Sequence, residues 1–95
     1  IELGEVEAAL LSHPAVAEAV VVPVPDDSIG HKLRALVVTT GAAPVSAGEL
    51  ARHCAQSLPK YMIPETIDSR PQLPKTSTGK IDRQRLVREY LAANA

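Results

Sequence analysis

AVVVPV at residues 19–24 and LRALVV at residues 33–38 are the two stretches that decide the fold. Valine-rich runs of this kind pack well on a pleated sheet, and they predict strands over residues 16–24 and 32–40. Pro23 cannot donate a hydrogen bond to a ladder, which favours an edge strand or a strand end for the first run. Pro25-Asp26-Asp27-Ser28 between them predicts a turn. We therefore expect the two strands to pair as an antiparallel hairpin.

Two helices are expected on either side of this hairpin in sequence. Leu3, Val6, Ala9 and Leu10 recur at helical spacing, which predicts a first helix over residues 4–12 that ends before Pro14. Ser46 and Glu49 form a capping box and so predict the start of a second helix, which Pro59 stops. The predicted apolar stripe of this second helix consists of Ala47, Leu50, Ala51, Cys54 and Leu58.

The last third of the chain predicts one more strand and one more helix. Residues 66–69 can add a short third strand. Asp82 is expected to cap a final helix, with Ile81 and Leu86 as a hydrophobic staple. Its expected buried stripe is Leu86, Val87, Tyr90 and Leu91. This order of elements predicts an α+β fold: a small two-layer domain in which about three helices pack on a mostly antiparallel three-stranded sheet.

Composition excludes several classes of function. The 95 residues are 45% hydrophobic and 22% charged, as in an ordinary globular domain. Phe and Trp are absent, which argues against base stacking and hence against a nucleic acid partner. No apolar run has the roughly 20 residues that a membrane span requires, so no membrane partner is expected. The lone Cys54 cannot form an internal disulfide and is interpreted as core filler, and a cytoplasmic location is expected.

Charge is distributed unevenly along the chain. Residues 1–69 hold four Lys or Arg against nine Asp or Glu, and residues 70–95 hold six against two. The basic end could face a nucleotide phosphate or an acidic protein, or it could be a solvated surface. Lys75, Arg83, Arg85 and Arg88 are interpreted as surface charges, and for some of them contact with nucleotide phosphates or an acidic protein stays open. His31 and His53 have no partners at metal-ligand spacing and are interpreted as surface residues, and His13 is interpreted as part of a helix end.

The loop LPKTSTGK at residues 73–80 is the most informative stretch for chemistry. Small hydroxylated residues and a glycine bring Lys80 to the tip of what we expect to be a flexible connection. A phosphate-binding P-loop is excluded, because Pro74 stands where its first Gly belongs and Ile81 where its metal-binding hydroxyl belongs. No metal site is predicted in the chain.

The motif from Pro74 to Lys80 resembles the closing motif of the adenylate-forming enzymes, which include acyl-CoA synthetases, luciferases and the adenylation domains of nonribosomal peptide synthesis. Ile81-Asp82-Arg83 and Leu86 match its continuation. Residues 1–7, IELGEVE, look like the segment after the family's interdomain hinge, and residues 60–64, KYMIP, fit the same pattern. The resemblance therefore covers nearly the whole chain. It implies that residues 1–95 are the small mobile C-terminal domain of an AMP-forming ligase, whose N-terminal domain is absent.

This resemblance implies that Lys80 is the catalytic lysine. In the family the large domain binds most of the ATP, with Mg²⁺, and the small domain closes over it. When a carboxylate attacks the α-phosphate, two anions are forced together, and a protonated Lys80 would relieve the repulsion. Gly79 would let the backbone approach closely. Thr76, Ser77 and Thr78 complete the expected ATP-facing loop.

The family also uses a second arrangement, in which the small domain swings so that a thiol reaches the acyl adenylate. The resemblance implies that Lys80 then leaves and that the segment around Gly4 and Glu5 approaches the thiol channel. For these two residues, an ordinary helix start with an acidic first turn is an equal alternative.

Three functions stay open at this point. IELGEVE looks more like peptide-synthetase adenylation domains than like fatty acyl-CoA ligases, which favours loading of an amino or aryl acid onto the phosphopantetheine of a carrier protein. An acyl-CoA synthetase that uses free CoA is the first alternative. A docking module without chemistry of its own is the second.

Overall fold

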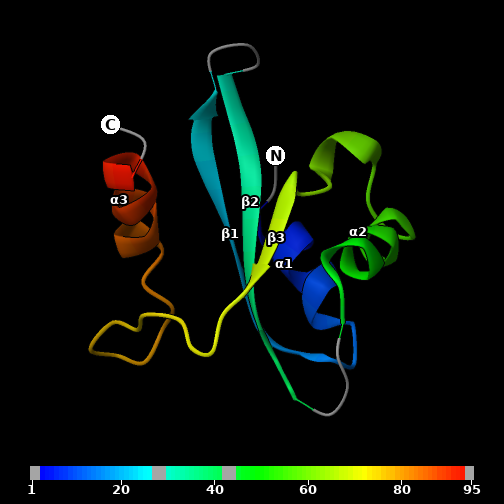
Figure 1. Cartoon of the computed structure of the whole chain (residues 1–95), viewed down its shortest axis with the longest axis horizontal. Coiled ribbons are helices and arrows are strands. Elements are labelled where there is room, and N and C mark those ends of the chain that lie inside the picture. Colours follow the sequence, from blue (N-terminus) through cyan, green and yellow to red (C-terminus); the bar gives the residue numbers. More distant parts are fainter. Residues whose placement is uncertain (1–2, 27–29, 42–44, 94–95) are drawn as a thin grey trace.

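The computed structural model describes residues 3–26, 30–41 and 45–93. Its elements follow the order expected from sequence, and Figure 1 shows them. They are α1 (Leu3–Leu11), β1 (Val16–Asp26), β2 (Gly30–Thr39), α2 (Ala47–Ala55), the 3-10 turn η1 (Lys60–Met62), β3 (Thr66–Ser69) and α3 (Arg83–Ala93). Asp27 and Ser28 of the predicted turn lie outside the described residues. The α+β class is confirmed.

The sheet has the order β1-β2-β3. β1 and β2 pair antiparallel from Val16↔Thr39 to Asp26↔Gly30, so the predicted hairpin is confirmed. The position of β1 at an edge of the sheet agrees with Pro23 in its sequence. β3 adds to the other side of β2 in the parallel direction, with Arg34↔Thr66 to Val37↔Ser69 as partners. The sheet is therefore mixed, although its longer ladder is antiparallel.

Helices cover both faces of this sheet, so the prediction of two layers is corrected to three (Figure 1). α1 and α2 pack on the face that carries Ala19, Val21 and Leu33, together with other buried residues. α3 packs on the opposite face, where Leu86 and Tyr90 meet Val20, Val22, Val24 and Leu36. The physical reason lies in residues 19–24: successive side chains of a strand point to opposite faces, and both faces here are apolar.

The N-cap of α2 forms at Ser46 as predicted, through the Ser46 half of the capping box. Ser46 is in an extended conformation, and its hydroxyl accepts a hydrogen bond of 3.1 Å from the Glu49 N–H. Leu50 and Cys54 are buried against the core, and Leu58 packs at its border. Ala47 is exposed, which corrects its place in the predicted stripe. Ala47 instead lines an open groove beside β3.

Ser46→Ala is expected to destabilise the protein by about 1 kcal/mol, because one N–H of the first turn of α2 loses its acceptor. Ser57→Ala is the matched control, since Ser57 is exposed and its hydroxyl caps no helix. Its effect should stay within about 0.5 kcal/mol. Urea denaturation followed by circular dichroism measures both. Equal effects of the two changes would contradict the assignment of the cap.

The start of α3 also agrees with the sequence. Asp82 Oδ1 accepts a hydrogen bond of 3.1 Å from the Arg85 N–H, so Asp82 caps the helix. Leu86 is fully buried with Ile81 packed at the edge of its cluster. The Arg34 guanidinium lies 4.4 Å from the centre of the Tyr90 ring, which fastens α3 to β2. Leu91 is 48% exposed, so the predicted stripe of α3 is narrower than expected.

Candidate functional site

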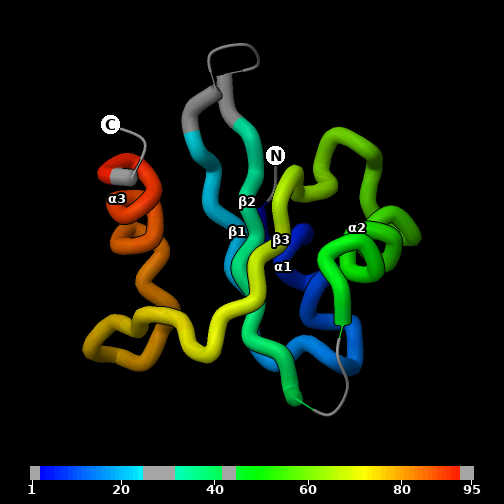
Figure 2. The backbone as a smooth tube through the Cα atoms, viewed as in Figure 1, coloured from blue at the N-terminus to red at the C-terminus, as the bar shows by residue number. Residues whose placement is uncertain are grey.

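Residues 74–82 form a small closed hairpin between β3 and α3. Figure 2 shows the chain leaving the sheet here before it returns to α3. Lys75 and Ile81 are antiparallel partners, and the Asp82 N–H donates to the Pro74 carbonyl at 2.8 Å. The Thr76 N–H donates to the Lys80 carbonyl at 2.7 Å. The connection that we expected to be flexible is therefore closed by its own backbone hydrogen bonds.

The tip of this hairpin is a tight turn that requires glycine at position 79. The Gly79 N–H donates to the Thr76 carbonyl at 3.0 Å, and Gly79 has a φ of 85°. A β-turn followed by a left-handed residue is a common three-residue hairpin loop. A Cβ on Gly79 would meet nothing within 4 Å in this domain, so the backbone angle, not space, demands glycine here.

Two threonine hydroxyls brace the turn from within. Thr76 Oγ1 and Thr78 Oγ1 are 2.9 Å apart, and the Lys80 N–H donates to Thr76 Oγ1 at 3.3 Å. Ser77 is exposed at the tip. Of the predicted loop residues, Thr76, Thr78 and Gly79 therefore shape the turn that carries Lys80.

The Lys80 side chain is exposed at the end of this turn. Its ammonium has no hydrogen-bond or ion-pair partner among the residues that the structure describes. An isolated ammonium on a hydrogen-bonded support is available to an anion from outside the domain. The main chain of the turn limits where that ammonium can reach.

Three of the four residues interpreted as surface charges form ion pairs. Lys75 Nζ lies 2.8 Å from Glu18 Oε1 on β1, and Arg83 binds Glu7 of α1. Arg85 pairs with Glu89 one turn along α3, at 3.5 Å. Arg88 is exposed. Sequence reasoning missed the first two pairs because their partners are 57 and 76 residues away in the chain.

Gly4 and Glu5 lie in the first turn of α1, on the other face of the sheet from α3. Both are exposed, and a Cβ on Gly4 would meet nothing within 4 Å. The structure therefore does not bring them together with Lys80 in one pocket. The described residues connect the two regions through Glu7 and Arg83.

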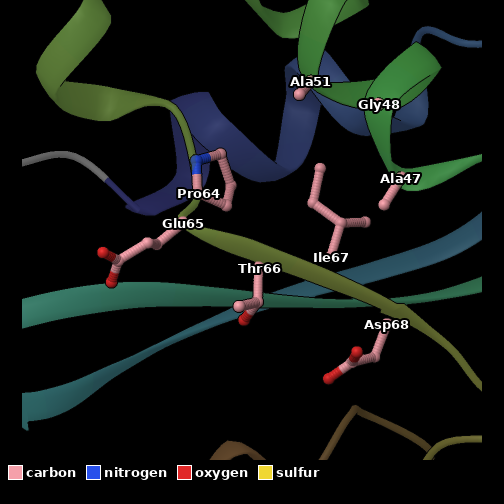
Figure 3. Close-up of a pocket in the computed structure, with 8 residues that line it drawn as sticks. All are labelled: Ala47, Gly48, Ala51, Pro64, Glu65, Thr66, Ile67 and Asp68. Carbon is pink, nitrogen blue, oxygen red and sulfur yellow. The ribbon is translucent and has the colours of Figure 1, made fainter.

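A groove of about 410 Å³ lies away from the Lys80 turn, between the start of α2 and the short strand β3. Figure 3 shows small side chains of α2, such as Ala47 and Ala51, facing Ile67 of β3. β3 is at the opposite edge of the sheet from β1, whose Glu18 holds Lys75. The groove is therefore separate from the candidate site.

Two of the histidines make contacts between neighbouring elements. His53 Nε2 lies 2.7 Å from the Ser12 hydroxyl, so His53 has a partner. His13 Nε2 lies 2.9 Å from Glu49 Oε2, and its Nδ1 accepts the Ala15 N–H at the end of α1, as its place in the sequence predicts. These contacts join α1 to α2. The side chain of His31 lies outside the described residues.

Cys54 is fully buried in the core between α1, α2 and the sheet, which confirms its interpretation as core filler. Burial raises the pKa of its thiol, because a thiolate would lose its hydration there. Within the described ranges, no three His, Cys, Asp or Glu side chains gather in a way that could hold a metal ion. None of the helices in that same part of the chain is long and apolar enough to cross a bilayer.

Comparison with known proteins agrees with these features. The sequence model of one protein family, the AMP-binding enzyme C-terminal domain, matches residues 5–80, and the chain belongs to this family. It is 46% identical over 89 residues to an L-proline--[L-prolyl-carrier protein] ligase from Pseudomonas fluorescens, which covers 94% of this chain and 18% of that protein. Its relatives include acyl-CoA ligases and nonribosomal peptide synthetases, so the resemblance to adenylate-forming enzymes is confirmed.

Solved structures show the same fold. An acyl-CoA synthetase from Brucella canis matches the whole chain with a TM-score of 0.94 at 38% identity, over 18% of its own length. An o-succinylbenzoate CoA synthetase from Bacillus subtilis, solved with its acyl-adenylate intermediate, matches 90% of this chain and 17% of that one, with a TM-score of 0.83 at 43% identity. The chain thus spans less than a fifth of the length of each of these proteins.

Proposed function

We propose that residues 1–95 are the mobile lid domain of an ATP-dependent ligase that activates a carboxylic acid as its acyl adenylate. The lid would close over a separate N-terminal domain that binds most of the ATP, with Mg²⁺, and the acid. The observation that carries the proposal is the exposed ammonium of Lys80, which has no ion-pair partner among the described residues and sits on a hydrogen-bonded turn. Membership of a family of adenylate-forming ligases supports it.

The chemistry of the turn suits a phosphate. Lys80 supplies a positive charge, and the exposed Ser77 supplies a hydroxyl that can donate a hydrogen bond. In the closed state, the carboxylate and the α-phosphate repel each other as they approach. Lys80 between them lowers this repulsion, an effect that grows as water leaves the site. Because the hairpin holds its backbone, Lys80 meets the developing charge with little reorganisation.

Transfer of the acyl group to a thiol would use a second position of the lid. In that position Lys80 withdraws, and Gly4 and Glu5 at the start of α1 lie near the incoming thiol. Support comes from the exposure of both residues and from the open space around Gly4, which leaves room for a narrow ligand. Their place on a different face of the sheet from α3 agrees with two alternating positions.

The favoured acceptor is the phosphopantetheine of an acyl or peptidyl carrier protein, with an amino or aryl acid as substrate, in the cytoplasm. The similarity to a ligase that loads L-proline onto a carrier protein supports it. The alternative acceptor is free CoA, favoured by the similarity to acyl-CoA synthetases. A docking module without chemistry is less well supported, because docking alone gives no reason to place a lysine that is unpaired among the described residues on a hydrogen-bonded turn.

The full-length parent protein is expected to catalyse acid-dependent exchange of pyrophosphate into ATP and then to load one class of thiol. Offering holo carrier protein and CoA to the preformed adenylate separates the two acceptors. The isolated 95-residue domain should catalyse no exchange, since the pockets for adenine and acid lie outside it. Exchange by the isolated domain would contradict this division of labour. A full-length protein that fails with every amino, aryl and fatty acid would contradict the proposal itself.

A further inference from the structure

Glu7 joins the two faces of the domain at the free edge of β1. Its Oε2 accepts the Val21 N–H of this edge strand at 2.8 Å and also binds the Arg83 guanidinium. Glu7 comes from α1, on one face of the sheet, and Arg83 is the first residue of α3, on the other. One carboxylate oxygen therefore connects a helix, a strand and the beginning of a second helix.

The same edge of β1 holds both ends of the hairpin that carries Lys80. Before the turn, Lys75 pairs with Glu18 of β1. After the turn, Arg83 pairs with Glu7. Between these anchors, the hairpin is closed by the pairing of Lys75 with Ile81. A displacement of Arg83 would therefore reach Lys80 through only two intervening residues, Ile81 and Asp82, whose backbone is held by hydrogen bonds.

Burial makes the Glu7 contact the stronger constraint of the two anchors. The Glu7 side chain is 16% exposed, whereas that of Glu18 is 36% exposed. A charge-assisted hydrogen bond to a mostly buried carboxylate keeps its geometry better than an ion pair to a more exposed one, even though Arg83 itself is 44% exposed. Val21 also fixes the carboxylate from a second direction, so that Glu7 presents a fixed acceptor to Arg83.

We infer that Glu7 is a positioning residue for adenylate formation: together with Arg83 it holds the Lys80 turn in register with the edge of β1. This inference rests on the proposed function of Lys80. Glu7 has no contact with the reacting groups in this account. Its role is to keep the Lys80 ammonium where it meets the developing charge once the lid closes.

The test uses Glu7→Gln and Arg83→Gln in the full-length enzyme. Glutamine at position 7 keeps an oxygen for Val21 but removes the charge that binds Arg83. Each variant should lower the kcat of adenylate formation about tenfold, with KM for ATP and acid within about twofold, because a small misplacement of a catalytic group weakens transition-state binding above all. Thiol transfer from supplied adenylate should stay within about twofold, because Lys80 withdraws in that step.

Two further variants separate positioning from general destabilisation. The double variant Glu7→Gln/Arg83→Gln should be no slower than either single one, within about twofold, because both changes break the same contact. Arg83→Lys should recover part of the lost rate, since it keeps a cation that can reach Glu7. Glu89→Gln is the matched control: it breaks the pairs that Glu89 of α3 makes with Arg70, which follows β3, and with Arg85, and it should leave adenylation unchanged.

The outcomes distinguish the inference from the function on which it rests. If Lys80→Ala stops adenylation but Glu7→Gln and Arg83→Gln do not slow it, the positioning role is wrong and the function stands. If Lys80→Ala has no effect, the proposed function itself fails. Equal loss of both half-reactions in the Glu7 and Arg83 variants, with a lower melting temperature, would reduce Glu7 to a structural role. If Glu7→Gln does not fold, the Arg83 variants test the positioning role instead, because the Arg83 side chain is 44% exposed and its replacement should not prevent folding.

Discussion

Lys80→Ala in the full-length enzyme is expected to lower the rate of adenylate formation by about 10²–10³-fold, as the loss of one preorganised electrostatic contact does in other active sites. The reason is that no other described side chain in or next to this hairpin offers an unpaired positive charge: Lys75 and Arg83, on either side of the turn, are engaged with Glu18 and Glu7. Pyrophosphate exchange measures this half-reaction.

Thioester formation from chemically supplied acyl adenylate should remain within about threefold of the parent enzyme in the same variant, because Lys80 contacts nothing in that step. Lys60→Ala is the matched control, since Lys60 is also an exposed lysine but lies in η1, outside the hairpin. It should leave both half-reactions unchanged. A comparable loss of thioester formation in Lys80→Ala would contradict the idea that the lid alternates between two positions.

Leu36→Ala is expected to destabilise the domain by about 2–5 kcal/mol, because it removes a fully buried side chain from the central strand and leaves a cavity. Leu36 lies in the cluster that holds α3 to the sheet, next to Leu86 and Tyr90. A loss of this size is a large part of the total stability of a small domain. Denaturation by urea, monitored by circular dichroism, measures it.

Leu91→Ala serves as the control for this change. Leu91 belongs to α3 but is 48% exposed, so the same deletion removes little buried surface and should cost less than about 1 kcal/mol. Similar losses in the two variants would mean that α3 does not pack on the sheet through Leu36. A large loss only at Leu36 would agree with the three-layer arrangement.

Much of the fold could be predicted from local patterns. The strands at residues 16–24 and 32–40 are almost those observed, since valine-rich runs suit a sheet in any surroundings. The cap at Ser46 and the cap at Asp82 could be located because each satisfies backbone N–H groups within a few residues. The direction of β3 could not be predicted, because parallel pairing with β2 depends on the path of the chain through α2.

The candidate site also has features that the sequence predicts and features that depend on the tertiary structure. By itself, the sequence determined that Lys80 follows a glycine in a short hydroxylated loop, because turn chemistry is local and Gly79 must supply the positive φ. Only the tertiary structure decided that this loop is a closed hairpin anchored at the edge of β1. The anchors are ion pairs of Lys75 with Glu18 and of Arg83 with Glu7, and charges so far apart in the chain meet only after the sheet has formed and both of its faces are covered.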